Sequence, residues 1–263
     1  MRRVIIVLLV LVGLFVAADF GAAALAESVV SRQMRQQIGL RDDPSVRING
    51  FPFLTQALTG RYGSVDVQAN NITVAELEDL SVQAQLRDVD APLSTVLGSG
   101  PKTLKVGEAE GSVRIPARDV EQLLNRNGAI TLDDLRIDPV DEAGLKAAAE
   151  ESDDTSLTSI DPDLAVRLTA TTVLPLLGEN EVSVIAQLSL DNGKARIVPR
   201  DVRFGGNALP TAVQRVVAEV FTVTVDPGSL PLQVTPTELT AESGALRVSG
   251  TARNLTIGGA STE

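Results

Sequence analysis

The chain has 263 residues, a formal net charge of −11, no cysteine and no histidine. Its acidity argues against a nucleic-acid partner, because phosphate binding draws its affinity from clustered Lys and Arg, and it also argues against electrostatic adhesion to anionic lipid. Without cysteine there is no disulfide framework, thiolate metal site or lipoprotein anchor. Without histidine the commonest general base, the usual zinc ligand and the Ser-His and Cys-His nucleophiles are missing, so we expect a non-catalytic protein without metal or cofactor.

The amino-terminal segment has the pattern of an export signal. Paired arginines precede fifteen uncharged residues, Val4–Ala18, and Ala24-Leu25-Ala26 is a small-residue cleavage site. An uncleaved anchor fits equally, since only Asp19 interrupts an apolar run close to the roughly 20 residues that span a bilayer. We therefore expect residues 1–26 to be a signal peptide or membrane anchor. Residues 27–263 should form an exported domain in the periplasm or at the outer face of the cytoplasmic membrane.

The next segment predicts a helix and then a series of strands. The apolar stripe of Ala22–Ile38 is helical in spacing, and Gly39 supplies its C-terminal stop. Beyond Pro44, apolar residues recur at every second position, which is typical of half-buried strands. The clearest such stretches are Val65–Ala69, Val82–Leu86, Leu164–Ala170 and Val182–Leu190. Asp191-Asn192-Gly193 predicts a tight hairpin that returns into Ala195–Val198, so the sheet should be antiparallel.

The rest of the chain supplies two amphipathic helices, three short strands and a loop. Arg118–Asn127 and Leu209–Phe221 each carry one apolar face at helical spacing. Short strands separated by Pro, Gly and Ser are expected at 230–234, 246–248 and 255–257, and the acidic stretch 138–163 is expected to be a mobile loop. Strands with a few interspersed helices predict an α+β fold with an antiparallel sheet.

The most distinctive segment is Val46–Tyr62, which contains Phe51-Pro52-Phe53. Pro52 fixes its own φ and favours an extended Phe51, after which Phe53 to Leu58 can begin a helical turn. One interpretation is a hydrophobic corner pinned into the core. The other is the wall or mouth of an apolar pocket, and the residues alone leave both open.

These residues resemble the LmeA-type family of exported, actinobacterial phospholipid-binding proteins. The resemblance runs through the membrane segment and the Ala-Glu-rich helix after it, through Gly50-Phe51-Pro52-Phe53-Leu54 with Gly60-Arg61-Tyr62, and through the closing stretches Leu230-Pro231-Leu232 and Leu246–Leu255. It covers essentially the whole chain. It implies a tubular lipid-binding fold, in which a long curved antiparallel sheet wraps around helices and leaves an apolar tunnel for phospholipid. It also implies a role in envelope glycolipid assembly, including elongation of the lipomannan mannan. The family offers no catalytic residues to carry over.

Two hypotheses follow. The first is a phospholipid-binding protein, held at the cytoplasmic membrane through its N-terminal segment and working with envelope-biosynthesis proteins. Arg61 is the candidate for meeting a head group, and the candidate cavity residues are Phe51, Pro52, Phe53, Leu54, Leu58, Leu123, Leu124, Val213, Val216, Val217, Val220 and Phe221. The second hypothesis is a structural or scaffolding envelope protein with a solid core and a protein partner. An enzyme acting on envelope glycolipid is a third and weaker hypothesis, because histidine is missing.

Overall fold

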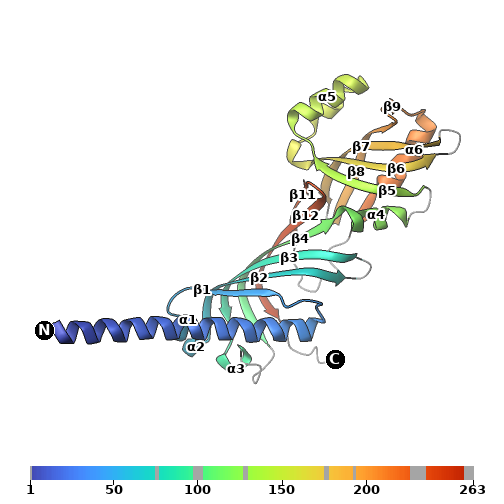
Figure 1. Ribbon diagram of the computed structural model, residues 1–263. Helices are drawn as coiled ribbons and strands as arrows, with labels where there is room; N and C mark the ends of the chain where they lie inside the picture. The colour runs from blue at the N-terminus through green and yellow to red at the C-terminus, as the bar shows by residue number, and fades with distance from the viewer. Residues whose placement is uncertain are drawn as a thin grey trace. The chain divides into compact units, whose positions relative to one another are not determined.

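The computed structural model describes residues 2–74, 77–96, 103–126, 130–174, 178–191, 194–225 and 235–257. It is an α+β structure with two antiparallel sheets that do not close, preceded by a long apolar helix (Figure 1). The expected fold class is thereby confirmed. The chain divides into two compact units: unit 1 comprises residues 1–73, 81–111 and 251–263, and unit 2 comprises residues 74–80 and 112–250.

The helices and strands have the following bounds. The α-helices are α1 (Arg2–Ile38), α2 (Phe53–Thr59), α3 (Leu93–Val96), α4 (Ala117–Asn125), α5 (Glu142–Ser152) and α6 (Thr211–Phe221), and the 3-10 turns are η1 (Thr155–Ser159) and η2 (Pro162–Leu164). The strands are β1 (Ser45–Asn49), β2 (Arg61–Val74), β3 (Leu77–Asp90), β4 (Leu104–Pro116), β5 (Leu132–Pro139), β6 (Ala165–Leu174), β7 (Gly178–Asp191), β8 (Lys194–Phe204), β9 (Asn207–Ala208), β10 (Val223–Val225), β11 (Thr235–Glu242) and β12 (Ala245–Ile257).

One sheet has the strand order β1-β2-β3-β4-β12-β11, and the other has the order β10-β8-β7-β6-β5 with β9 beside β8. In the first sheet β1 pairs with β2 so that Ile48 lies opposite Val65. In the second, β7 and β8 form the hairpin expected from the sequence, with Asp191 opposite Lys194. The turn residues Asn192 and Gly193 lie outside the described residues.

The core of unit 1 lies where α1 and α2 pack on the sheet (Figure 1). Small side chains of α1 at positions 22, 23 and 26 allow the helix to approach closely. They meet the buried side chains of Ile48, Phe53, Ala57, Tyr62, Val89, Ala91, Val106 and Ala109. The carboxyl-terminal half of α1 is therefore part of the folded unit.

A break in strand alternation directs side chains into this core. Leu86 and Val89 of β3 are three residues apart and would face opposite sides of a regular strand, yet both pack in the same cluster. Between them Asp88 has a φ of +51°, in the left-handed region, which lets the chain shift by one residue. Gly107 of β4 lies against this point, since a Cβ there would come within 2.9 Å of the Asp88 Cβ.

Unit 2 is organised around β6 and β7, most of whose described side chains are buried. Helix α4 packs on β5, α6 packs on β8, and α4 also contacts α6. A second cluster is formed where α5 and η1 cover the sheet through Leu145, Leu157, Ile160 and Ile185. Both amphipathic helices expected from the sequence are confirmed with slightly different ends, since α4 ends at Asn125 and α6 begins at Thr211, after Pro210.

Two expectations about elements are wrong. The stretches 246–248 and 255–257 are not separate strands but parts of the single strand β12, which passes through Ser249 and Gly250. The stretch 138–163 is not a loop, because it contains α5 and both 3-10 turns. Asp141 caps α5 by accepting a hydrogen bond from the Gly144 N–H at 2.8 Å. The expected strand at 230–234 lies outside the described residues.

Candidate functional site

The contact between α1 and α2 is built on a buried carboxylate. Asp19 is 2% exposed, and its two oxygens accept hydrogen bonds from the backbone N–H groups of Phe53 and Leu54, each at 2.8 Å. The first N–H groups of a helix have no partner within the helix, and Pro52, which precedes α2, has no side-chain acceptor to supply one. Asp19 therefore caps α2 from another helix and fixes α2 to α1.

Two further contacts continue this attachment along α1. Glu27 Oε1 accepts a hydrogen bond from the Ile48 N–H at 2.7 Å, and the Ser31 hydroxyl donates to the Pro44 carbonyl at 2.5 Å. The preceding part of α1 is different, because its large apolar side chains from Val4 to Phe15 are exposed. By length and composition α1 is apolar enough to cross a membrane. The helix thus has an exposed apolar part and a part packed into unit 1.

The Phe51–Leu58 segment, expected to line a cavity, divides between the core and the surface. Phe53 is buried and packs beside Tyr62, with ring centroids 6.4 Å apart, while Pro52 and Leu54 are half-buried. Phe51 is 57% exposed and stacks on Phe20 of α1 at 6.2 Å, and Leu58 is 84% exposed. Phe53 thus fits the core interpretation, whereas Phe51 and Leu58 face outward.

Tyr62 places a polar atom in this core. Its hydroxyl is buried and has no hydrogen-bond partner among the residues that the structure describes. Burial raises the pKa of Tyr62 above its ordinary value of 10.0, because the phenolate would lose its hydration. The side chain therefore stays a neutral hydroxyl at neutral pH. The neighbouring Arg61, the expected head-group contact, is exposed at the start of β2.

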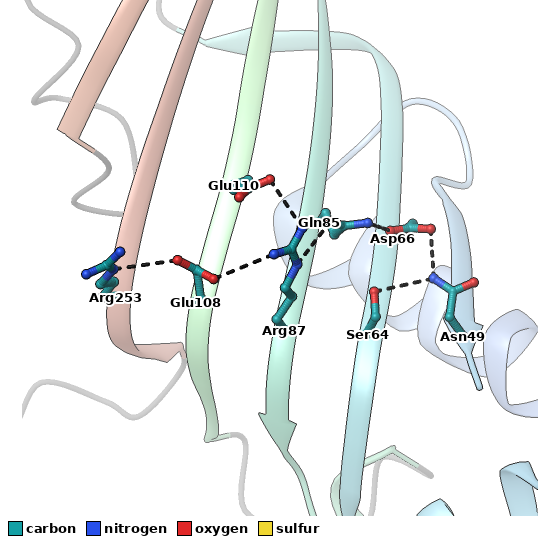
Figure 2. Close-up of polar contacts among 8 residues, drawn as sticks. All are labelled: Asn49, Ser64, Asp66, Gln85, Arg87, Glu108, Glu110 and Arg253. Carbon is teal, nitrogen blue, oxygen red and sulfur yellow. Dashed lines mark hydrogen bonds and ion pairs between the residues drawn. The ribbon is translucent and has the colours of Figure 1, made fainter. Parts of the chain in front are cut away.

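A polar network marks one face of the unit 1 sheet (Figure 2). Asp66 accepts hydrogen bonds from Asn49 at 2.8 Å and from Gln85 at 3.1 Å, and Gln85 accepts from Arg87 at 2.8 Å. The network extends over β4 and β12 through ion pairs of Arg87 with Glu108 and Glu110 and of Arg253 with Glu108, at 3.6 to 3.8 Å. Exposed pairs of this kind contribute little stability individually, but they fix which face of each strand is polar.

The opposite face of the same strands is apolar and incompletely covered. Strand neighbours alternate in direction, so the residues flanking Asp66 and Gln85 point away from the polar network: Val65, Val67, Ala84 and Leu86. Val65 and Leu86 pack against the unit 1 core, and Val67 and Ala84 are half-buried. We call these four residues the apolar sheet face. The sequence already contained their alternation, but it does not show how far such a face is covered.

The expected cavity residues on α4 and α6 lie in unit 2. Leu124, Val217, Val220 and Phe221 are buried, Leu123 and Val213 are half-buried, and Val216 is exposed. The structure brings these two helices together beside β5 and β8. Their apolar faces therefore lie inside unit 2 as the spacing predicts, and their role as lipid contacts stays a prediction.

A cavity of 570 Å³ lies in unit 2 between β5, α5 and η2. Its lining includes Asp138, Asp141 and Asp163 with Arg167. Three carboxylates against one guanidinium do not suit the negative phosphate of a phospholipid. This cavity is therefore a poor candidate for a head-group site.

Comparison with known families identifies the group to which these features belong. A family model described as LmeA-like phospholipid-binding matches residues 17–251. The chain belongs to this family. No curated protein and no solved structure matches the chain significantly. The resemblance seen around Phe51-Pro52-Phe53 is confirmed, and so is membership of a phospholipid-binding family.

The extent of the match agrees with the geometry of α1. It begins at residue 17, so it includes the Asp19 cap and leaves out most of the exposed apolar part of the helix. Besides the Asp19 cap, the matched region also contains the apolar sheet face of unit 1. This face offers aliphatic side chains that an acyl chain can contact, and sequence reasoning did not single it out.

Proposed function

We propose that this protein is anchored by α1 at the outer face of the cytoplasmic membrane, where it binds phospholipid and holds its acyl chains without catalysing a reaction. Membership of the LmeA-like phospholipid-binding family over residues 17–251 is the observation that carries the proposal. The apolar helix supports the location, because its exposed part is suited to a bilayer and its remainder is built into unit 1.

The apolar sheet face is the proposed acyl-chain contact in unit 1. It is half-buried rather than fully covered at Val67 and Ala84, and it continues into the core through Val65 and Leu86. Each methylene removed from water contributes about 0.8 kcal/mol, so two acyl chains need no strong charge contact. This agrees with a chain whose net charge is −11. Arg61 remains the proposed head-group contact in the same unit.

A matched pair of variants tests the proposed contact. Val67→Glu adds a carboxylate to the apolar sheet face, and Gln68→Glu adds one at the next residue, which is exposed. We expect full-length protein purified from its own membranes to carry phospholipid in lipid extracts. Val67→Glu should lower the bound amount several-fold, whereas Gln68→Glu should not change it. Val67→Met, which keeps an apolar side chain, should retain binding and shows that the position tolerates exchange.

The outcomes separate the site from the function. Wild-type protein that neither carries phospholipid nor takes it up after delipidation would overturn the function. Normal lipid content in Val67→Glu would overturn the site alone.

We also propose that the bound lipid serves envelope glycolipid assembly of the lipomannan type, together with envelope-biosynthesis proteins. The support is the family resemblance and the proposed position at the membrane. Cells that lack the chain should make lipomannan with a shorter mannan, measured by electrophoresis of extracted glycolipids. Restoration by the wild type and by Gln68→Glu, but not by Val67→Glu, would connect the phenotype to lipid binding.

The alternative is a scaffolding protein with a solid core. Complete burial of Val217, Val220 and Phe221 favours this alternative for unit 2, because side chains so enclosed already pack against protein. Native mass spectrometry distinguishes the two functions. A stoichiometric protein partner without phospholipid supports scaffolding, whereas phospholipid without a partner supports the lipid-binding function.

A further inference from the structure

Exposed apolar side chains continue past the N-terminal apolar run of α1 and recur on the segment that leads into α2. Outside α1, the described residues include four exposed large apolar side chains, and two of these are Phe51, just before α2, and Leu58, within α2. On α1 itself, Phe20 is 63% exposed and Leu25 is 70% exposed, beyond the apolar run Val4–Ala18. Isolated exposed apolar residues are common, but this set adjoins a helix that is suited to a bilayer.

The geometry fixes Phe20 and Phe51 to one level of α1. Asp19 caps α2, and the next residue, Phe20, stacks on Phe51. Figure 1 shows α2 beside the middle of α1, with the N-terminal part of the helix extending past it. Phe51 is therefore held where α1 passes from the packed core of unit 1 into its exposed apolar part.

The length of the apolar run gives a physical reason for contact with a bilayer at this point. Fifteen residues of helix at about 1.5 Å each rise about 22 Å, whereas the hydrocarbon core is about 30 Å thick. The shortfall of about 8 Å corresponds to about five more residues of helix, which reaches beyond Phe20. Asp19 lies in this interval, but its carboxylate is enclosed by protein and not exposed to lipid.

We propose that unit 1 docks on the same bilayer that holds α1, with Phe20, Phe51 and Leu58 inserted among the lipids at the membrane surface. Phenylalanine and leucine are the residues that interfacial segments bury at the boundary between head groups and acyl chains. Arg61 follows Leu58 by three residues and is exposed, which suits the level of the phosphates. The proposal rests on the anchoring of α1 proposed above, and it gives Phe51 and Leu58 a membrane contact in place of a cavity wall.

The chain is suited to a direct test because it contains no native cysteine. Single cysteines replace Leu58, Val10 or Gln68 in the full-length protein and carry an environment-sensitive dye. The protein is reconstituted in vesicles of phosphatidylcholine and phosphatidylglycerol. Quenching by lipids with a nitroxide on the acyl chain reports insertion, and quenching by aqueous iodide reports exposure to water. Val10 lies in the exposed apolar run, so the dye there reports whether α1 is inserted in the bilayer. Gln68 is an exposed polar position of unit 1, so the dye there serves as the water-exposed control.

We expect the dye at Leu58 to be quenched several-fold more by nitroxide lipid than the dye at Gln68, and to be protected from iodide. The double variant Phe20→Ser/Phe51→Ser should reduce the lipid quenching at Leu58 while the quenching at Val10 stays unchanged. Equal quenching at Leu58 and Gln68, with Val10 inserted, would overturn the docking proposal. If the dye at Leu58 is protected from both quenchers, and this protection rises with protein concentration, then a second copy of the chain covers Phe20, Phe51 and Leu58. That result would also overturn the docking proposal. The amount of phospholipid that co-purifies with the same variants in detergent is measured separately. It tests the proposed lipid binding independently of membrane docking.

Discussion

Asp19 lies within an apolar, membrane-suited sequence and also makes hydrogen bonds that hold the fold of unit 1 together. It is the one charged residue between Arg3 and Glu27, and a carboxylate in the middle of an apolar run would be costly in lipid. Its two hydrogen bonds to α2 remove that cost, because the side chain ends inside unit 1. The residue thus marks where the protein-facing part of α1 begins.

Replacing Asp19 should weaken unit 1 more than its place near the amino terminus suggests. Asp19→Ala leaves two N–H groups at the start of α2 without their acceptor, and we expect the free energy of unfolding to fall by about 1–3 kcal/mol. Asp19→Asn should cost less, because its amide oxygen can still accept a hydrogen bond. The measurement is urea unfolding of the full-length protein in detergent micelles. Ser28→Ala removes an exposed hydrogen bond within α1 and is the control; a loss no larger than that of the control would contradict the role of Asp19.

At the scale of elements, the pairing of β3 with β4 depends on a glycine. A Cβ at position 107 would lie 2.9 Å from the Asp88 Cβ, where Asp88 takes its positive φ. We expect Gly107→Ala to lower the free energy of unfolding by about 1–3 kcal/mol, because backbone and side chain must shift to relieve the clash. Gly63→Ala is the matched control in β2, since nothing lies within 4 Å of a Cβ there and its φ is not positive. Unfolding midpoints in urea compare the two variants, and equal midpoints would show that the strands absorb the methyl group easily.

The type of an element could be predicted where buried and exposed positions alternate with the period of a strand or a helix. The alternation of Val182–Leu190 and the apolar spacing of α6 identified a strand and a helix, because each pattern reflects one buried face. The prediction of a loop at 138–163 is wrong because acidity alone does not distinguish a solvated loop from a helix with an exposed face. The Ala- and Glu-rich sequence of this stretch favours a helix, and Asp141 provides the N-cap. The prediction of two strands in place of β12 is wrong at Ser249 and Gly250, because a glycine flanked by strand partners need not end a strand.

The candidate site was less predictable than the elements. The Phe51-Pro52-Phe53 segment was recognised, but its division into a buried Phe53 and an exposed Phe51 depends on Asp19, a partner 34 residues away from Phe53 in the sequence. The apolar sheet face was not singled out for a related reason. Alternation shows that a face is apolar, whereas its coverage depends on which helices pack on it.

At the scale of the whole molecule, the same contacts bear on whether the amino-terminal segment is retained. Cleavage after Ala26 would remove Asp19 and the small residues of α1 that pack against Phe53 and Tyr62. It would leave Glu27, with its hydrogen bond to Ile48, at the new terminus. Removal of the segment would therefore remove part of the unit 1 core, so we expect α1 to be retained as an anchor.

Two measurements check this expectation. Intact mass and amino-terminal sequencing of the protein from its native membranes should show that the segment before Glu27 is present, and extraction should require detergent rather than alkaline carbonate. A terminus at Glu27 would contradict retention. In parallel, a chain that begins at residue 17 keeps the Asp19 cap and should unfold at a higher urea concentration than one that begins at residue 27. The difference should be several kcal/mol, since one cap contributes about 1–2 kcal/mol and loss of the alanines that cover Phe53 adds to it. Equal stability of the two chains would mean that unit 1 does not depend on the buried part of α1, and retention would then lose its structural reason.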